Sequence, residues 1–169
     1  MLLEVLKYPH PVLKQKAEPV LVVTPEIREL AENMLETMYE NDGIGLAAPQ
    51  VGELKRMVVI DVTGPDAREA PMVLINPEVA RIGEDVESEE GCLSVEEYRN
   101  TLIRSDRVRL KATDLDGKPV ELEAEDILAV CLQHECDHLD GILFIDHLSR
   151  LKRSLYDSKV KKRLKAKNG

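Results

Sequence analysis

The sequence predicts an α+β fold in which short, mostly antiparallel strands form small sheets around one buried central helix. Three observations support this prediction. Several short segments rich in Val and Ile are separated by turn residues, a pattern typical of short strands. Residues 125–139 are apolar almost all round before His134, as expected of a helix enclosed by protein. Stretches with helical spacing near each end of the chain predict an N-terminal and a C-terminal helix.

The N-terminal helix is predicted to begin after Thr24 and to stop at Gly43. Thr24 is a favourable N-cap, and Pro25 stands at the first helical position, where a missing N–H does no harm. Residues 1–23 contain three prolines and are expected to be extended chain and turns. The apolar residues at helical spacing, which should face the core, are Ile27, Leu30, Ala31, Met34, Leu35 and Met38.

The strands are predicted from β-branched runs and from turn signals between them. The predicted strands are residues 57–62, 72–75, 79–82, 86–88, 108–113 and 120–123. Two of them, 79–82 and 86–88, are expected to be joined around Gly83. The last two alternate on either side of Asp116-Gly117, a dipeptide typical of a tight hairpin turn.

The last 20 residues are predicted to form a third helix, a basic appendage over residues 148–167. Residues 150–169 hold nine Lys/Arg and one acidic residue, a net charge of +8, whereas the other 149 residues carry −17. The acidic body disfavours DNA, and the basic helix could bind RNA. The apolar stripe expected to pack this helix is Leu148, Leu151, Leu155, Val160 and Leu164.

Size and composition predict a cytoplasmic protein with one domain over residues 1–169. The chain has one Phe, no Trp and four Tyr, so its core is expected to be aliphatic. No apolar run reaches membrane-spanning length, and the first four residues do not resemble a signal peptide. The three cysteines are too few for a disulfide framework and suit a reducing compartment.

Residues 134–138 read His-Glu-Cys-Asp-His, an H-E-x-x-H sequence within the predicted buried helix. Because residues four apart share one helix face, His134 and His138 can present two imidazoles to one metal ion. Glu135 can then lie beside a water held by the ion and take its proton. The alternative is a helix that happens to carry two histidines. A third ligand elsewhere in the chain would favour a metal site over this alternative.

A third ligand is sought among the cysteines, because the residues after His138 do not follow the spacing of well-known zinc proteases. Cys131 shares the face of the two histidines, but it lies ~10.5 Å along the helix axis from His138. Cys131 is therefore predicted to line a pocket or the core, and Cys136, which points away, to be buried core. Cys92 follows Gly91, which lets backbone approach a ligand closely; on spacing alone it is equally a ligand or a packed thiol.

Two further groups of polar residues remain open. Asp137 and Arg104 are either a pair that steadies the metal-binding helix, because ligating groups usually need such support, or a plain surface salt bridge. His10 and His147 belong to no matching motif and are predicted to be structural or solvated.

Three segments, in this order, resemble the peptide deformylases of the bacterial type with a C-terminal helix. They are residues 43–50 (GIGLAAPQ), 90–94 (EGCLS) and 133–141 (QHECDHLDG), and the similarity extends over nearly the whole chain. The chain departs from the family pattern after Val95, where Glu96 and Glu97 stand at a place that holds Pro in many relatives.

The resemblance implies that Cys92, His134 and His138 bind one divalent metal ion. Fe²⁺ is the common ion of the family, and Zn²⁺, Ni²⁺ or Co²⁺ also suit these ligands. The implied reaction is hydrolysis of the N-formyl group from N-formylmethionyl nascent chains, which releases formate. Glu135 would be the general base and later the proton donor to the leaving amine. Formylated chain starts point to a bacterium or an organelle, and the first residues, which do not resemble a transit peptide, favour a bacterium.

The resemblance also implies how the substrate is held. The side-chain amide of Gln50 and the backbone N–H of Leu93 would form the oxyanion hole. The backbone of Ile44 and Gly45 would pair with the extended peptide as an added strand. The residues implied in substrate binding, most of them around the methionine side chain, are Ile44, Gly45, Glu90, Gly91, Arg99, Ile127, Val130 and Cys131.

Two rival functions and one further partner follow from single features. The H-E-x-x-H sequence alone would suit a general zinc endoprotease, but the Cys92 segment and Gln50 oppose it. The basic tail alone would suit a non-catalytic ribosome- or RNA-binding module, which the complete ligand set and base oppose. As part of the enzyme, residues 150–169 are either a ribosome-docking helix or a solvated helix packed by its leucines.

Overall fold

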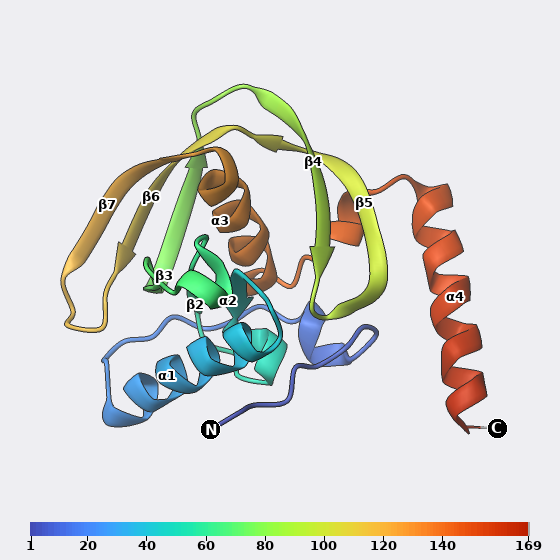
Figure 1. Cartoon of the computed structure of the whole chain (residues 1–169), viewed down its shortest axis with the longest axis horizontal. Coiled ribbons are helices and arrows are strands. Elements are labelled where there is room, and N and C mark those ends of the chain that lie inside the picture. The colour runs from blue at the N-terminus through green and yellow to red at the C-terminus, as the bar shows by residue number, and fades with distance from the viewer. Residues whose placement is uncertain (169) are drawn as a thin grey trace.

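A computed structural model describes residues 1–168 and confirms the α+β class. Helix α3 (Asp126–Leu139) lies between a five-stranded sheet and a separate β-hairpin, and helix α1 (Pro25–Glu40) lies at one end of this arrangement (Figure 1). Helix α4 (Arg150–Asn168) stands on the outer side of the hairpin (Figure 1). The short helical turns are η1 (Pro11–Lys14), η2 (Ala48–Val51), α2 (Gly64–Ala67) and η3 (Phe144–His147). Within the described residues, no helix is long and apolar enough to cross a membrane.

The larger sheet is antiparallel throughout, with the strand order β1-β2-β3-β6-β7. Its strands are β1 (Gly45–Ala47), β2 (Met57–Ile60), β3 (Met72–Arg81), β6 (Arg107–Thr113) and β7 (Pro119–Glu125). Every residue of β2 is buried, and α3 covers this part of the sheet. The predicted hairpin at Asp116-Gly117 is confirmed as the β6–β7 turn. Strand β1 lies at the edge of the sheet, where it can accept another strand.

One predicted strand boundary is wrong. Residues 79–82 do not form a strand of their own, because β3 continues from Met72 to Arg81. Its pairing with β6 shifts between Ile75 and Glu78, and Asn76 adopts a left-handed backbone with φ of +51°. Pro77 lies in this bulge, where no ladder hydrogen bond is required of it. The proline therefore bends the strand without ending it.

The smaller sheet is a hairpin of β4 (Asp85–Cys92) and β5 (Val95–Ser105). The connection expected around Gly83 is present, since β3 ends at Arg81 and β4 begins at Asp85, but β4 pairs with β5 and not with β3. Strand β5 was not predicted. Because β4 ends at Cys92 and β5 starts at Val95, this hairpin delivers Cys92 to the face of α3 that carries the histidines.

The helices begin and end close to the predicted positions, but α4 packs through a different face. The Thr24 hydroxyl accepts a hydrogen bond from the Ile27 N–H at 3.3 Å, which confirms it as the N-cap of α1. In α4, Leu151 and Leu155 are 69% and 61% exposed, whereas Tyr156 is buried. The predicted leucine stripe is therefore wrong for its first turns, and Tyr156 with Val160 makes the contact.

The interior is aliphatic around α1 and α3 and aromatic beneath α4. Four of the five aromatic residues, Tyr8, Tyr98, Phe144 and Tyr156, belong to one cluster between α4, the β4–β5 hairpin and the N-terminal segment. The expected aliphatic core is therefore correct for the cluster around α3 and, apart from Tyr39, for the cluster around α1, and it is wrong for this third one. Cys136, predicted to be buried core, is only half-buried.

Candidate metal centre

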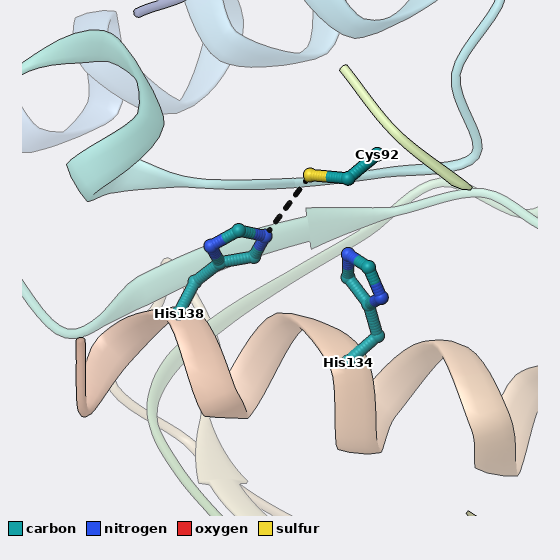
Figure 2. A group of neighbouring side chains, drawn as sticks. All are labelled: Cys92, His134 and His138. Atoms are coloured by element: carbon teal, nitrogen blue, oxygen red, sulfur yellow. Dashed lines mark hydrogen bonds between the residues drawn. The ribbon is translucent and has the colours of Figure 1, made fainter. Parts of the chain in front are cut away.

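Helix α3 presents His134 and His138 from one face toward Cys92 at the end of β4, as Figure 2 shows. One ligand atom from each of the three residues lies within 4.8 Å of the others. Cys92 Sγ is 3.4 Å from His138 Nε2. A thiolate and two imidazoles at this separation are a donor set typical of a divalent transition metal. The structure therefore brings together the ligands that the sequence resemblance implied.

The chemistry of this donor set fits a metal ion. His134 Nδ1 lies 2.8 Å from Glu90 Oε1, so a proton on Nδ1 leaves Nε2 as the ligating nitrogen. Burial raises the pKa of the Cys92 thiol, but the positive charges of His138 and His134 outweigh it and hold that pKa well below its usual range. The thiolate that a metal requires is thus favoured.

Behind the two histidines lies a buried ion-pair network centred on Arg104. This guanidinium is fully buried and donates to Glu90 at 2.8 and 2.9 Å and to Asp137 at 2.8 Å. Burial raises the pKa of Glu90, but Arg104 and His134 together lower it to about 2. Arg104 and Asp137 therefore form an internal pair that supports α3, and the alternative of a surface salt bridge is wrong. His147 Nε2 lies 2.9 Å from Asp137, which gives it a structural place in this network.

Glu135 is 5% exposed, and its Oε1 atom has no hydrogen-bond partner among residues 1–168. Oε1 lies 4.0 Å from His138 Nε2, so the carboxylate borders the donor set. Burial raises the pKa of this carboxyl, with the charges of the two histidines acting in the opposite direction. An unpaired buried carboxylate is costly unless something else binds it, and a water or a substrate proton would do so.

Gly45 in β1 lies directly opposite this carboxylate. A Cβ atom at Gly45 would come within 2.5 Å of Glu135 Oε2 and 2.9 Å of Cys131 Sγ, closer than atoms can approach. The edge strand therefore runs so close to Glu135 that any larger residue at position 45 would require the Glu135 and Cys131 side chains to move. Cys131 lies on the same side of α3 as His134 and lines the same cavity, as the helical spacing predicted.

Gln50 and Leu93 lie on the other side of Cys92. The Gln50 side-chain oxygen accepts from the Ala47 N–H at 2.9 Å, which fixes the orientation of the amide. Its Nε2 atom donates to Ser94 Oγ at 3.1 Å and lies 3.5 Å from Cys92 Sγ. The Gln50 amide nitrogen therefore lies between the buried Ser94 hydroxyl and the Cys92 sulfur of the donor set.

These residues surround one cavity of about 940 Å³. All eight residues implied in substrate binding line it: Ile44, Gly45, Glu90, Gly91, Arg99, Ile127, Val130 and Cys131. Gln50, Leu93, Cys92, His134 and Glu135 line it as well, whereas His138 lies behind them. The sequence reasoning missed other lining residues, among them Asp42, Glu87, Glu97 and Tyr98. Three of these four lie in the β4–β5 hairpin, whose second strand was not predicted.

Comparison with known proteins gives one consistent answer. The family model described as Polypeptide deformylase matches residues 2–154. A peptide deformylase of Thermodesulfovibrio yellowstonii is 49% identical over 160 residues, covering 95% of this chain and 97% of that relative. A solved peptide deformylase of Legionella pneumophila shares 41% identity at a TM-score of 0.91, covering 98% of each chain. That of Ehrlichia chaffeensis in complex with actinonin shares 39% at 0.89, covering 96% of this chain and 97% of that one. The chain therefore belongs to the polypeptide deformylase family of metallohydrolases.

Proposed function

We propose that this enzyme removes the formyl group from N-formylmethionyl nascent chains and releases formate, acting in the cytoplasm of a bacterium. The observation that carries the proposal is the buried carboxylate of Glu135, whose Oε1 atom has no hydrogen-bond partner among residues 1–168, beside the Cys92, His134 and His138 donor set at the cavity. Such a carboxylate next to a metal position is suited to accept a proton from an attacking water.

Cys92, His134 and His138 would hold one divalent ion, for which we propose Fe²⁺; Zn²⁺, Ni²⁺ and Co²⁺ suit the same donors. When bound, the ion would act as a Lewis acid that lowers the pKa of a water and polarises the formyl carbonyl. The network of Glu90 and Arg104 would keep the His134 ring in its ligating orientation, because a proton held between Nδ1 and Glu90 leaves Nε2 for the ion.

Glu135 would accept the proton of the attacking water through Oε1 and later return it to the amine nitrogen that leaves. Burial raises the pKa of this carboxyl, which brings it nearer the range in which one group can both accept and donate. The Gln50 amide and the Leu93 N–H would donate to the oxygen that becomes negative. The long 3.5 Å contact from Gln50 Nε2 to Cys92 Sγ is weak enough for a substrate oxygen to replace it.

The cavity also suits an extended peptide with an apolar first side chain. Ile44 and Gly45 place the free edge of the large sheet at the cavity, where a peptide backbone could add as a strand. Ile127, Val130 and Cys131 provide an apolar wall for methionine. The Glu90 carboxylate is occupied by Arg104 and His134, so we assign it a supporting rather than a substrate-contacting role.

The test is formate release from formyl-Met-Ala-Ser by protein prepared without oxygen and loaded with iron or nickel. Glu135→Gln should lower kcat by about 1,000-fold while metal content stays that of the wild type, since the ligands are unchanged. Cleavage of an internal bond in a blocked, non-formylated peptide would favour a general endoprotease instead. Metal-loaded protein that releases no formate in any metal form would reject the proposal.

We further infer that the basic helix α4 contacts the ribosome. The support is the net charge of +8 over residues 150–169 and the solvent-facing lysines of this helix. Changing Lys161, Lys162 and Lys165 together to Gln should weaken ribosome binding in a salt-dependent way and leave peptide turnover unchanged. Ribosome affinity equal to that of the wild type would refute this inference. These substitutions spare Tyr156 and Val160, so α4 remains docked.

A further inference from the structure

The turn between β4 and β5 carries Cys92 at its start and Leu93 as its next residue. Leu93 and Ser94 are the two residues between the strands, and Cys92 pairs with Val95 across them after a register shift at Gly91. Groups from elsewhere in the chain bind both carbonyls of this turn and the acidic residues that follow it.

The N-terminal segment supplies the first of these contacts. Lys7 Nζ donates to the Leu93 carbonyl at 2.6 Å and lies 3.9 Å from Glu96 Oε1. The neighbouring Tyr8 N–H donates to the Ser94 carbonyl at 2.7 Å. Both carbonyls of the turn are thus bound by two consecutive residues from a segment more than 80 positions away in the sequence. The charged contact from Lys7 is the shorter and stronger type.

The C-terminal helix supplies the second contact, on the acidic pair that follows the turn. Arg163 Nη1 lies 3.4 Å from Glu96 Oε2, and Nη2 lies 3.7 Å from Glu97 Oε2. Glu96 therefore stands between Lys7 from one end of the chain and Arg163 from the other. Glu97 has a left-handed backbone with φ of +53°, a conformation that needs support from its surroundings.

We propose that Lys7 and Arg163 are positioning residues, which hold the turn so that the Leu93 N–H points at the reacting oxygen. The inference rests on the proposed function, in which that N–H stabilises the oxyanion. Since a shift of 1 Å in a reacting group can lower the rate by about 100-fold, a partial loosening of the turn should have a smaller but measurable effect. Because the contact matters most in the transition state, kcat should fall more than KM changes.

The test compares Lys7→Gln with Lys16→Gln, a matched change at an exposed lysine of the same N-terminal segment. Kinetics on formyl-Met-Ala-Ser, metal content and the thermal unfolding midpoint are measured for each protein. We expect Lys7→Gln to lower kcat about tenfold with KM and metal content unchanged, Lys7→Arg to recover most of that loss, and Lys16→Gln to match the wild type. Arg163→Glu should lower kcat about threefold, because it sets a negative charge against Glu96 and Glu97, and Arg163→Lys should keep most of the wild-type kcat.

The outcomes separate this inference from the function on which it rests. If the wild type releases formate but Lys7→Gln keeps the same kcat, the positioning role is refuted, whatever happens to the unfolding midpoint. A fall in activity that follows loss of metal would also refute it, because the effect would then run through Cys92 rather than Leu93. A wild-type enzyme without formate release would reject the proposed function and the inference together.

Discussion

Helices α3, with 14 residues, and α4, with 19 residues, differ in how the rest of the molecule holds them. Helix α3 is enclosed by the large sheet and the β4–β5 hairpin, and a continuous run from Cys131 to Glu135 is buried. Among the described residues of α4, Tyr156 and Val160 are buried and the rest are exposed or half-buried. Two of the three proposed metal ligands, His134 and His138, and the proposed base Glu135 lie on the enclosed helix, among buried neighbours. The basic residues lie on the other helix, which remains accessible to a large partner.

The ion pairs of the two helices differ in the same way. Arg104 and Glu90, which support α3, are 0% and 6% exposed, whereas Arg163 and Glu96, which link α4 to the hairpin, are 28% and 36% exposed. Removing one member of a buried pair leaves the other charge buried with neither a partner nor water around it. In an exposed pair, water largely takes the place of the lost partner. The loss of one charge should therefore lower the free energy of unfolding far more in the network behind α3 than in the pair beside α4.

The largest expected effect is that of Arg104→Met. The change leaves Glu90 and Asp137 without their buried partner and should lower the free energy of unfolding by about 3–5 kcal/mol at neutral pH. Arg99→Met is the matched control, because Arg99 lies on the same strand and pairs with Glu89 in an exposed position. It should change stability by less than about 1 kcal/mol. Denaturant unfolding measures both, and equal losses would contradict the contrast between buried and exposed pairs.

Much of α3 and its site could be predicted from the sequence because the signals are local. The spacing of His134 and His138 fixes one helix face, and Cys131 was placed on that face by the same argument. The role of Cys92 could not be assigned from spacing, because Cys92 reaches the helix only through the β4–β5 hairpin, which is distant from α3 in the sequence. Only the resemblance to a family favoured a ligand over a packed thiol at this position.

Strand β5 was missed for a physical reason that concerns the same site. Its inward-facing residues include Asn100 and Arg104 as well as Tyr98 and Leu102, so polar residues interrupt the alternation that identifies a strand. Arg104 can face inward only because Glu90 and Asp137 meet it there. Those partners lie on two other elements, and a reading of local periodicity could not supply them.

The second prediction removes the contact that holds α4. Tyr156→Ala should lower the free energy of unfolding by about 3 kcal/mol, because the ring is buried against Tyr98 at a centroid distance of 4.6 Å. Amide hydrogen exchange should accelerate over residues 150–168 and stay slow over residues 126–139. Tyr156→Phe retains the ring and should behave nearly as the wild type. Equal acceleration of exchange in both helices would show that α4 does not unfold locally more readily than α3.

The third prediction concerns alkaline pH. Burial and a hydrogen bond to Asp157 of α4 raise the pKa of Tyr8, and burial raises the pKa of Tyr156, so both phenols stay neutral in the folded chain. A raised pKa means that this stabilisation is complete below about pH 10, the value for an unfolded tyrosine, and is lost as the pH rises through the folded-state pKa. Stability measured from about pH 8 to about pH 11 should therefore fall as the pH rises. The fall should be shallower in Tyr8→Phe, and an unchanged slope would exclude this tyrosine as the cause.

The smallest effect is expected where the sequence pattern was misleading. Leu151 and Leu155 repeat at helical spacing and were predicted to dock α4. This helix has apolar residues on more than one side, however, and the side that makes contact depends on the residues that lie opposite it. Here Tyr8 and Tyr98 lie opposite, and they meet Tyr156.

Changing Leu151 and Leu155 together to Gln should therefore alter the free energy of unfolding by less than about 0.5 kcal/mol per site. Val160→Ala, a smaller chemical change on the buried side, should lower it by about 1–2 kcal/mol. Urea unfolding of the three proteins decides between the two faces. If the double leucine variant lost as much stability as Val160→Ala, the leucine face would be the docking face, and α4 would have to be rotated about its axis relative to the hairpin.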